Sequence, residues 1–147
     1  MRVLFLLLFP VFCSAQTFVK DRFIAKDGAV LWSEKFEMKD MDTPIVVQNL
    51  TEKLRSKPFI EIDNMQQEGV FEGSIFAFAN LTKAQFRVDF LYESYIVTVS
   101  SVVIKTDTEE IPLEIMLLKT NGNFMAKLPD FIEKFDAEMV SLFLITH

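Results

Sequence analysis

Two stretches of alternating polar and apolar residues lie in the middle of the chain, between Ala84 and Lys105. In the first, every second residue is apolar or aromatic: Phe86, Val88, Phe90 and Tyr92. The second continues the pattern from Tyr95 to Ile104. A period of two is typical of a strand with one buried face, and aromatic and β-branched residues suit a pleated surface. Only Glu93 and Ser94 separate the two stretches, which predicts an antiparallel hairpin.

Further strands are predicted on both sides of this hairpin. Alternation or a short apolar run predicts strands over four other stretches, 29–38, 59–62, 70–79 and 111–119. Gly73 within the third stretch favours a bulge or strong curvature, and Pro112 places the last one at a sheet edge. Residues 16–27 have no clear period and are interpreted as a lead-in segment.

Two segments have the apolar spacing of amphipathic helices. The first starts at Thr43-Pro44, a pair typical of a helix N-terminus, and is expected to reach about Ser56. The second lies near the end of the chain and carries a broad apolar stripe: Leu128, Phe131, Ile132, Phe135, Met139, Leu142 and Phe143. The order of elements predicts an α+β fold. A curved antiparallel sheet of about five to six strands would carry an N-proximal and a C-terminal helix on one face.

The first fifteen residues have the composition of a secretory signal peptide. Arg2 precedes an apolar run that ends at Phe12, and the small residues Ser14 and Ala15 follow. The run is shorter than the roughly 20 apolar residues of a membrane span, and no later segment is longer. The expected organisation is a signal peptide over 1–15, a lead-in segment over 16–27 and a single domain over 28–147. The protein is therefore expected to be exported, either to the periplasm or out of the cell.

Cysteine content and charge narrow the expected chemistry. Cys13 is the only cysteine, and the large Phe12 before it disfavours lipid anchoring at that position. Cleavage after Ala15 would leave a mature chain without cysteine, and hence without a disulfide or a thiolate nucleophile. That chain carries 14 Lys and Arg against 21 Asp and Glu, a formal charge of −7. An acidic surface disfavours nucleic acid and anionic membranes as partners.

Three stretches resemble DUF4468, a family of exported proteins from Bacteroidetes-type bacteria that is described as having a TBP-like fold. They are VLWSEKFEM with the Thr-Pro helix start after it, the strands FEGSIFAFA and FRVDFLYESYIVTVSSVVI, and the closing FDAEMVSLF. The resemblance covers about Val30 to Leu144 and implies a TBP-like fold. It implies no catalytic residues, since none is established for the family. The Glu93-Ser94 turn departs from the family pattern of a Gly and a basic residue.

The residue types of common catalytic and metal sites are scarce. The only histidine, His147, ends the chain, so neither a Ser–His or Cys–His relay nor a zinc site has a rigidly held imidazole. No cofactor or metal is expected. Carboxylates leave one enzymatic alternative: Glu61, Glu72 and Asp89 lie on predicted strands and could share a face, as acid–base hydrolysis of envelope glycans would require. The favoured interpretation is that they line the solvent side of the sheet.

Phenylalanines on both faces of the stretch 70–79 motivate the main functional hypothesis. Phe71 opposes Phe76 and Phe78, and two helices could cover only one face of the sheet, leaving apolar surface for a partner. The sequence therefore predicts a non-enzymatic binding module that takes a protein or a small apolar ligand through Phe76 and Phe78. A second alternative is a carrier of small apolar molecules, with a closed cavity between sheet and helices. DNA binding by Phe wedges, as in TBP, is disfavoured by the acidic charge.

Overall fold

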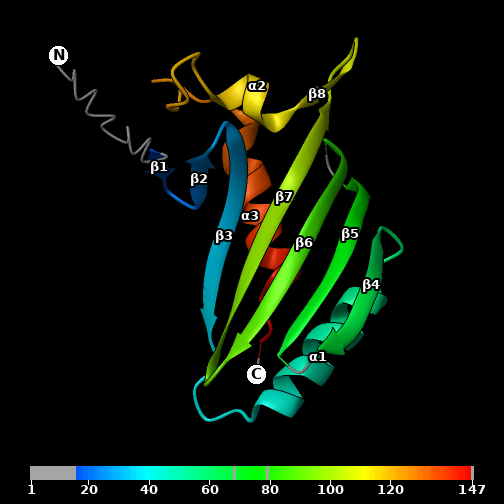
Figure 1. The fold of residues 1–147 in the computed structure, drawn as a ribbon. Helices are drawn as coiled ribbons and strands as arrows, with labels where there is room; N and C mark the ends of the chain where they lie inside the picture. The colour runs from blue at the N-terminus through cyan, green and yellow to red at the C-terminus, as the bar shows by residue number, and fades with distance from the viewer. Residues whose placement is uncertain (1–15, 68, 79, 147) are drawn as a thin grey trace, which may run out of the picture.

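The computed structural model describes residues 16–67, 69–78 and 80–146, with only the backbone described for residues 64–67. The predicted signal peptide, with Cys13, lies outside the described residues, as does His147. The elements follow one another in this order (Figure 1): β1 (Thr17–Lys20), β2 (Phe23–Lys26), β3 (Ala29–Glu37), α1 (Thr43–Arg55), β4 (Ile60–Gln67), β5 (Val70–Phe78), β6 (Leu81–Leu91), β7 (Ser94–Lys105), β8 (Glu110–Pro112), α2 (Leu113–Leu117) and α3 (Phe131–Phe143).

The eight strands of the described residues form one antiparallel sheet. Its order is β1-β2-β3-β7-β6-β5-β4, and β8 pairs with the last residues of β7. The predicted central hairpin is present as β6 and β7, which pair as far as Leu91 and Ser94. Tyr92 and Glu93 form its turn, and Glu93 adopts a left-handed φ of 49°. The turn thus reaches a conformation that usually favours glycine without having one.

The sheet has eight strands where the sequence predicts five to six, and two additional strands at its edge account for the difference. The expected lead-in segment forms β1 and β2, which pair with each other and add a hairpin to the edge of β3. Strands of four residues have only two side chains on each face, so their alternation is hard to recognise. In the stretch 111–119 only β8 is a strand. Leu113 and Leu117 are instead buried one helical turn apart in α2, a third helix that was not predicted.

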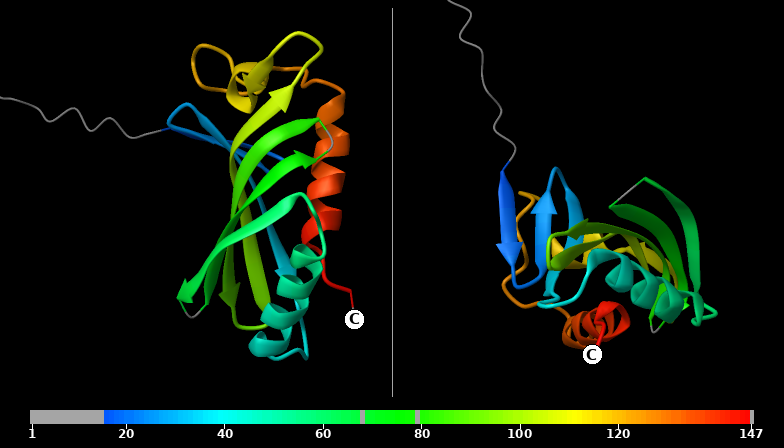
Figure 2. Two further views of the ribbon diagram at one scale, coloured as in Figure 1. Left: turned by 90° about the vertical axis from the view of Figure 1, so that its right-hand side faces the viewer. Right: turned by 90° about the horizontal axis from the view of Figure 1, so that it is seen from below.

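Helices α1 and α3 lie on the same face of the sheet, as predicted, and the strands curve across them (Figure 2). Helix α1 spans Thr43–Arg55, close to the predicted extent, with Thr43 as its first residue and Asp42 at the N-cap position. Strand β4 is longer than the predicted strand 59–62, because it continues to Gln67 with shifts in register. None of the helices in the described part of the chain has the length and apolar character needed to cross a bilayer.

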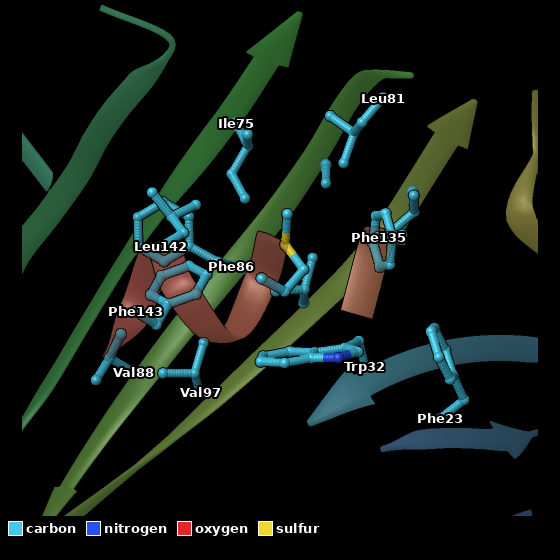
Figure 3. Close-up of a cluster of buried hydrophobic side chains, with 14 of the residues drawn as sticks. Phe23, Trp32, Ile75, Leu81, Phe86, Val88, Val97, Phe135, Leu142 and Phe143 are labelled. Atoms are coloured by element: carbon cyan, nitrogen blue, oxygen red, sulfur yellow. The ribbon is translucent and has the colours of Figure 1, made fainter. Parts of the chain in front are cut away.

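Aromatic side chains fill the space between the sheet and α3 (Figure 3). Trp32 on β3 is fully buried, and its ring stacks on that of Phe143 with centroids 6.4 Å apart. Phe86 on β6 also packs against Phe143, with ring centroids 5.3 Å apart. Gly73 on β5 makes room for Phe86, because a Cβ atom there would lie 2.5 Å from the Phe86 ring. This close approach of the Phe86 ring to the backbone of β5 explains why position 73 is a glycine.

Candidate functional site

The face of the sheet opposite α1 and α3, called the open face below, carries the candidate site. Its side chains alternate along each strand with the buried residues of the core. Across the middle of this face, Arg87 on β6 pairs with Glu72 on β5 and Thr98 on β7. In the next row Gln85 pairs with Ser74 and Ser100. The centre of the open face is therefore polar, not apolar as the sequence-based hypothesis expects.

A hollow of about 310 Å³ lies in the open face and is called the central hollow below. Side chains and backbone from β3, β4, β5, β6 and β7 line it: Leu31, Asp63, Glu72, Gly73, Gln85, Phe86, Arg87, Thr98 and Ser100. Its volume lies at the lower end of the range of about 300–1,000 Å³ that is typical of small-ligand sites. Five adjacent strands thus converge on one shallow polar depression.

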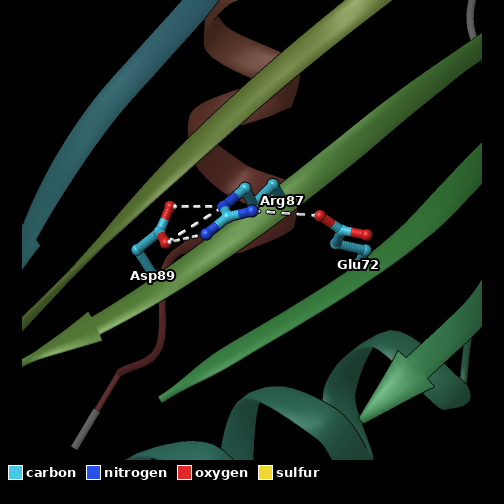
Figure 4. A network of polar contacts seen from close by, with 3 residues as sticks. All are labelled: Glu72, Arg87 and Asp89. Atoms are coloured by element: carbon cyan, nitrogen blue, oxygen red, sulfur yellow. Dashed lines mark hydrogen bonds and ion pairs between the residues drawn. The ribbon is translucent and has the colours of Figure 1, made fainter. Parts of the chain in front are cut away.

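Arg87 connects two carboxylates beside the central hollow (Figure 4). Its Nε and Nη2 atoms donate to Asp89 Oδ1 at 3.0 and 2.9 Å, and its Nη1 atom donates to Glu72 Oε1 at 3.2 Å. The hydrogen bonds and charge of Asp89, followed by the charge of Glu72, raise the pKa of Arg87. On the neighbouring strands, Ser74 donates a hydrogen bond of 3.2 Å to Asp63. These contacts fix the directions in which the polar groups face.

The three carboxylates considered for acid–base chemistry do share the open face. Glu72 and Asp89 flank one guanidinium, whereas Glu61 lies a row away, opposite Ser74. Glu61 and Glu72 are exposed and Asp89 is half-buried. A general acid of the glycosidase type needs a carboxyl in a water-poor, apolar environment, and none of the three has one.

Phe76 and Phe78, the predicted interaction residues, lie in different environments. Phe76 is 43% exposed, lies opposite Lys83 and follows Ser74 by two residues on the open face. Phe78 is half-buried, packs against the core and stacks on Phe59 with centroids 4.4 Å apart. Ala77 between them has a left-handed φ of 48°, which breaks the alternation of the strand. The two rings therefore do not form one apolar platform, and their role in binding stays a prediction.

A second polar cluster, on the helix side of the sheet, was not predicted. Arg22 forms ion pairs with Glu34 on β3 and with Asp136 on α3, and Trp32 Nε1 donates to Asp136 Oδ1 at 2.7 Å. The hydrogen bond that Arg22 donates to Glu34 is the largest influence raising the pKa of Arg22. The one signal for this cluster in the sequence is Glu34, which interrupts the apolar alternation of its strand. The partners link the turn between β1 and β2 to β3 and α3, so the cluster holds these elements together.

A groove of about 520 Å³ lies next to this cluster, between α1 and α3. Lys53 of α1 borders it and donates to the main-chain oxygens of Ser141 at 2.7 Å and Leu144 at 2.5 Å. Burial, assisted by Lys57, lowers the pKa of Lys53. These bonds satisfy carbonyls at the end of α3, which is a structural task. Across residues 16–67, 69–78 and 80–146, no three His, Cys, Asp or Glu side chains gather as a metal site.

Two solved structures match this fold over most of the chain. A DUF4468 family protein from Bacteroides ovatus aligns with a TM-score of 0.52 and 16% identity, over 78% of this chain and 80% of that one. A TBP-like protein from Parabacteroides distasonis aligns with a TM-score of 0.51 and 16% identity, over 80% of this chain and 94% of that one. No family model and no curated protein matches the chain. The protein thus has a TBP-like fold, shared with a DUF4468 family structure, as the sequence resemblance implies.

Proposed function

We propose that the protein is an exported, non-enzymatic binding module that takes its partner on the open face of the sheet. The observation that carries this proposal is the central hollow, which five strands line and into which four of them, β4, β5, β6 and β7, direct polar side chains. Both long helices lie on the other face, so a partner can reach the hollow without displacing a packed element (Figure 2). The fold alone carries no function, because one fold serves many unrelated sites.

The structure lends less support to the two alternatives. A carrier of small apolar molecules needs a cavity between sheet and helices, and the Trp32, Phe86 and Phe143 rings fill that space. A carboxylate enzyme needs a shielded acid, whereas Glu72 is exposed and shares Arg87 with Asp89. DNA binding of the TBP type would bring phosphates toward an acidic chain, which electrostatics opposes.

Site-specific photo-cross-linking tests whether the open face is the binding surface. A photoreactive phenylalanine analogue would replace Gln85, which is exposed and lines the central hollow. The matched control places the same group at Glu133, an exposed residue of α3 on the helix side. Irradiation of producing cells is expected to give adducts from position 85 and none from position 133. Adducts from position 133 alone, or from neither position, would overturn the proposal.

Export is tested separately by the mass of the protein that cells accumulate. Cleavage after Ala15 gives a chain that begins at Gln16, and this chain is expected in the envelope or the medium. A full-length chain that starts at Met1 and stays in the cytoplasm would refute this part of the proposal without touching the binding surface.

A further inference from the structure

We infer that the central hollow binds a neutral carbohydrate, an inference that rests on the proposed binding function and names its ligand class. The argument starts from the hydrogen-bonding groups that line the hollow. Arg87 can only donate, Asp63 and Glu72 as carboxylates can only accept, and Gln85, Thr98 and Ser100 can do both. A sugar hydroxyl is itself both donor and acceptor, so a row of hydroxyls is the ligand that such a mixed lining can satisfy.

Other ligand classes leave part of this lining without a partner. An anion would lie against Asp63 and Glu72, and a cation would lie against Arg87. An apolar ligand would strip water from several polar groups and return no hydrogen bonds, which is unfavourable. A neutral polyhydroxylated ligand meets neither penalty. Arg87 is also held in place by Asp89, which orients its guanidinium before any ligand arrives.

The exposed Phe76 ring supplies the second feature of a sugar site, an aromatic surface beside the polar groups. Phe76 and Ser74 point to the same face of β5 about 7 Å apart, and Ser74 lies directly opposite Gln85. The C–H faces of a pyranose ring are apolar while its rim carries hydroxyls. A sugar chain lying along β5 could therefore stack one ring on Phe76 while hydroxyls of the next ring enter the central hollow.

The size and depth of the site set the expected strength of binding. The hollow is shallow and open to water, which competes for every hydrogen bond, so a single sugar ring gains little. An oligosaccharide that spans both Phe76 and the central hollow adds the two contributions, and should bind more tightly than a disaccharide of the same sugar.

Titration with pure oligosaccharides tests the inference. The exported chain, labelled with ¹⁵N, would be titrated with hexasaccharides of glucose, xylose, mannose and N-acetylglucosamine while its amide resonances are followed. At least one is expected to shift amides around Gln85, Arg87 and Thr98. Gln85→Ala and Phe76→Ala are each expected to weaken that binding by about 5-fold, since a hydrogen bond or a ring contact contributes about 1 kcal/mol.

Tyr92→Ala is the matched control, because Tyr92 is an aromatic residue that is 87% exposed at the far end of the same hairpin. About 30 Å separates it from Phe76, as the length of β6 between them shows. This variant is expected to bind as the native chain does. Binding that Tyr92→Ala weakens, or that Gln85→Ala and Phe76→Ala leave unchanged, would overturn the inference.

The titration and the cross-linking experiment fail independently. If no hexasaccharide shifts the resonances of the central hollow at millimolar concentration, the carbohydrate inference is refuted. Protein adducts from position 85 would then show that the open face is nevertheless a binding surface, and the proposed function would stand with a different ligand class. Failure of both experiments would remove both conclusions.

Discussion

The phenol of Tyr95 on β7 donates a hydrogen bond of 2.6 Å to the main-chain oxygen of Phe143, at the end of α3. The same phenolic oxygen accepts a hydrogen bond of 3.3 Å from the amide of Ile145. Tyr95 is fully buried, and burial raises its pKa to about 12, while the hydrogen bond from Ile145 acts in the opposite direction. This side chain therefore ties the end of the chain to the middle of the sheet only while it keeps its proton.

We predict that stability falls as the pH rises from about 10 to about 12. An unfolded chain releases the tyrosine proton near pH 10, whereas the folded chain retains it to about pH 12. Between these two pH values deprotonation lowers the free energy of the unfolded state alone, so the free energy of unfolding falls. The loss should reach about 2–3 kcal/mol, and the contribution is fully present below pH 10. Urea unfolding at pH 8, 10, 11 and 12 measures it.

Tyr95→Phe is the control for that profile. It should lower stability at pH 8 by about 1–3 kcal/mol, because the buried Ile145 amide and Phe143 oxygen lose their partner. Its decline between pH 10 and 12 should be shallower than that of the native chain. An equally steep decline in this variant would assign the alkaline loss to other groups.

Loss of the Asp136 carboxylate should weaken the attachment of α3 to the sheet. Asp136→Ala leaves the buried Trp32 Nε1–H group without an acceptor and removes one partner of Arg22, so we expect a loss of about 2–3 kcal/mol. Asp136→Asn keeps an acceptor oxygen and should lose less. Glu133→Ala, at an exposed site on the same helix, should change stability by no more than about 0.5 kcal/mol. Equal losses for Asp136→Ala and Glu133→Ala in thermal unfolding would contradict this account.

Gly73 is predicted to tolerate no side chain. A Cβ atom would lie 2.3 Å from the main-chain oxygen of Glu61 on the neighbouring strand and 2.5 Å from the Phe86 ring. The backbone oxygen cannot move without disturbing the pairing of β4 and β5, so Gly73→Ala should destabilise the fold by about 1–3 kcal/mol. Ser74→Ala, one residue along on the open face, should be close to neutral. Denaturant unfolding midpoints of the two variants test this prediction. An unchanged midpoint for Gly73→Ala would contradict it and show that the strands can move apart to admit the methyl group.

Substitution of Phe76 and of Phe78 should give different losses of stability, because only the Phe78 ring has a structural role. Phe78→Ser removes a ring that stacks on Phe59 and packs against the core, and should cost about 2–3 kcal/mol. Phe76→Ser changes an exposed ring and should cost less than about 1 kcal/mol. If thermal unfolding ranks the two variants in the opposite order, Phe76 is the structural residue.

The elements that the sequence predicts best are those with long, regular patterns. The strands β6 and β7 are each more than ten residues long and alternate regularly on the side nearer their turn, and α3 repeats its apolar stripe over 13 residues. Strands β1 and β2 are too short to show a period. The run from Leu113 to Leu117 is apolar at spacings that suit both a strand and one helical turn. Only the burial of both leucines in the folded protein distinguishes the helix from a strand.

The candidate site is less predictable because its parts meet through pairing between strands. A period of two correctly places Glu72 and Asp89 on one face, but their meeting at Arg87 depends on the register of β5 against β6. The different environment of Phe78 follows from the left-handed backbone of Ala77, and alanine gives no sign of that conformation in a sequence. Polar residues on a strand look like ordinary solvent-facing positions until four neighbouring strands bring them together.

Trp32 is positioned to serve as an intrinsic fluorescence probe of folding. It is the only tryptophan in the chain, and its indole is shielded from water, held by Asp136 and stacked on Phe143. Its fluorescence should therefore be that of an apolar environment and should move to longer wavelength when α3 separates from the sheet. A ligand on the open face lies on the other side of β3 and leaves this signal unchanged. Unfolding and ligand binding can thus be followed in one sample, the first by emission colour and the second by resonances of the opposite face.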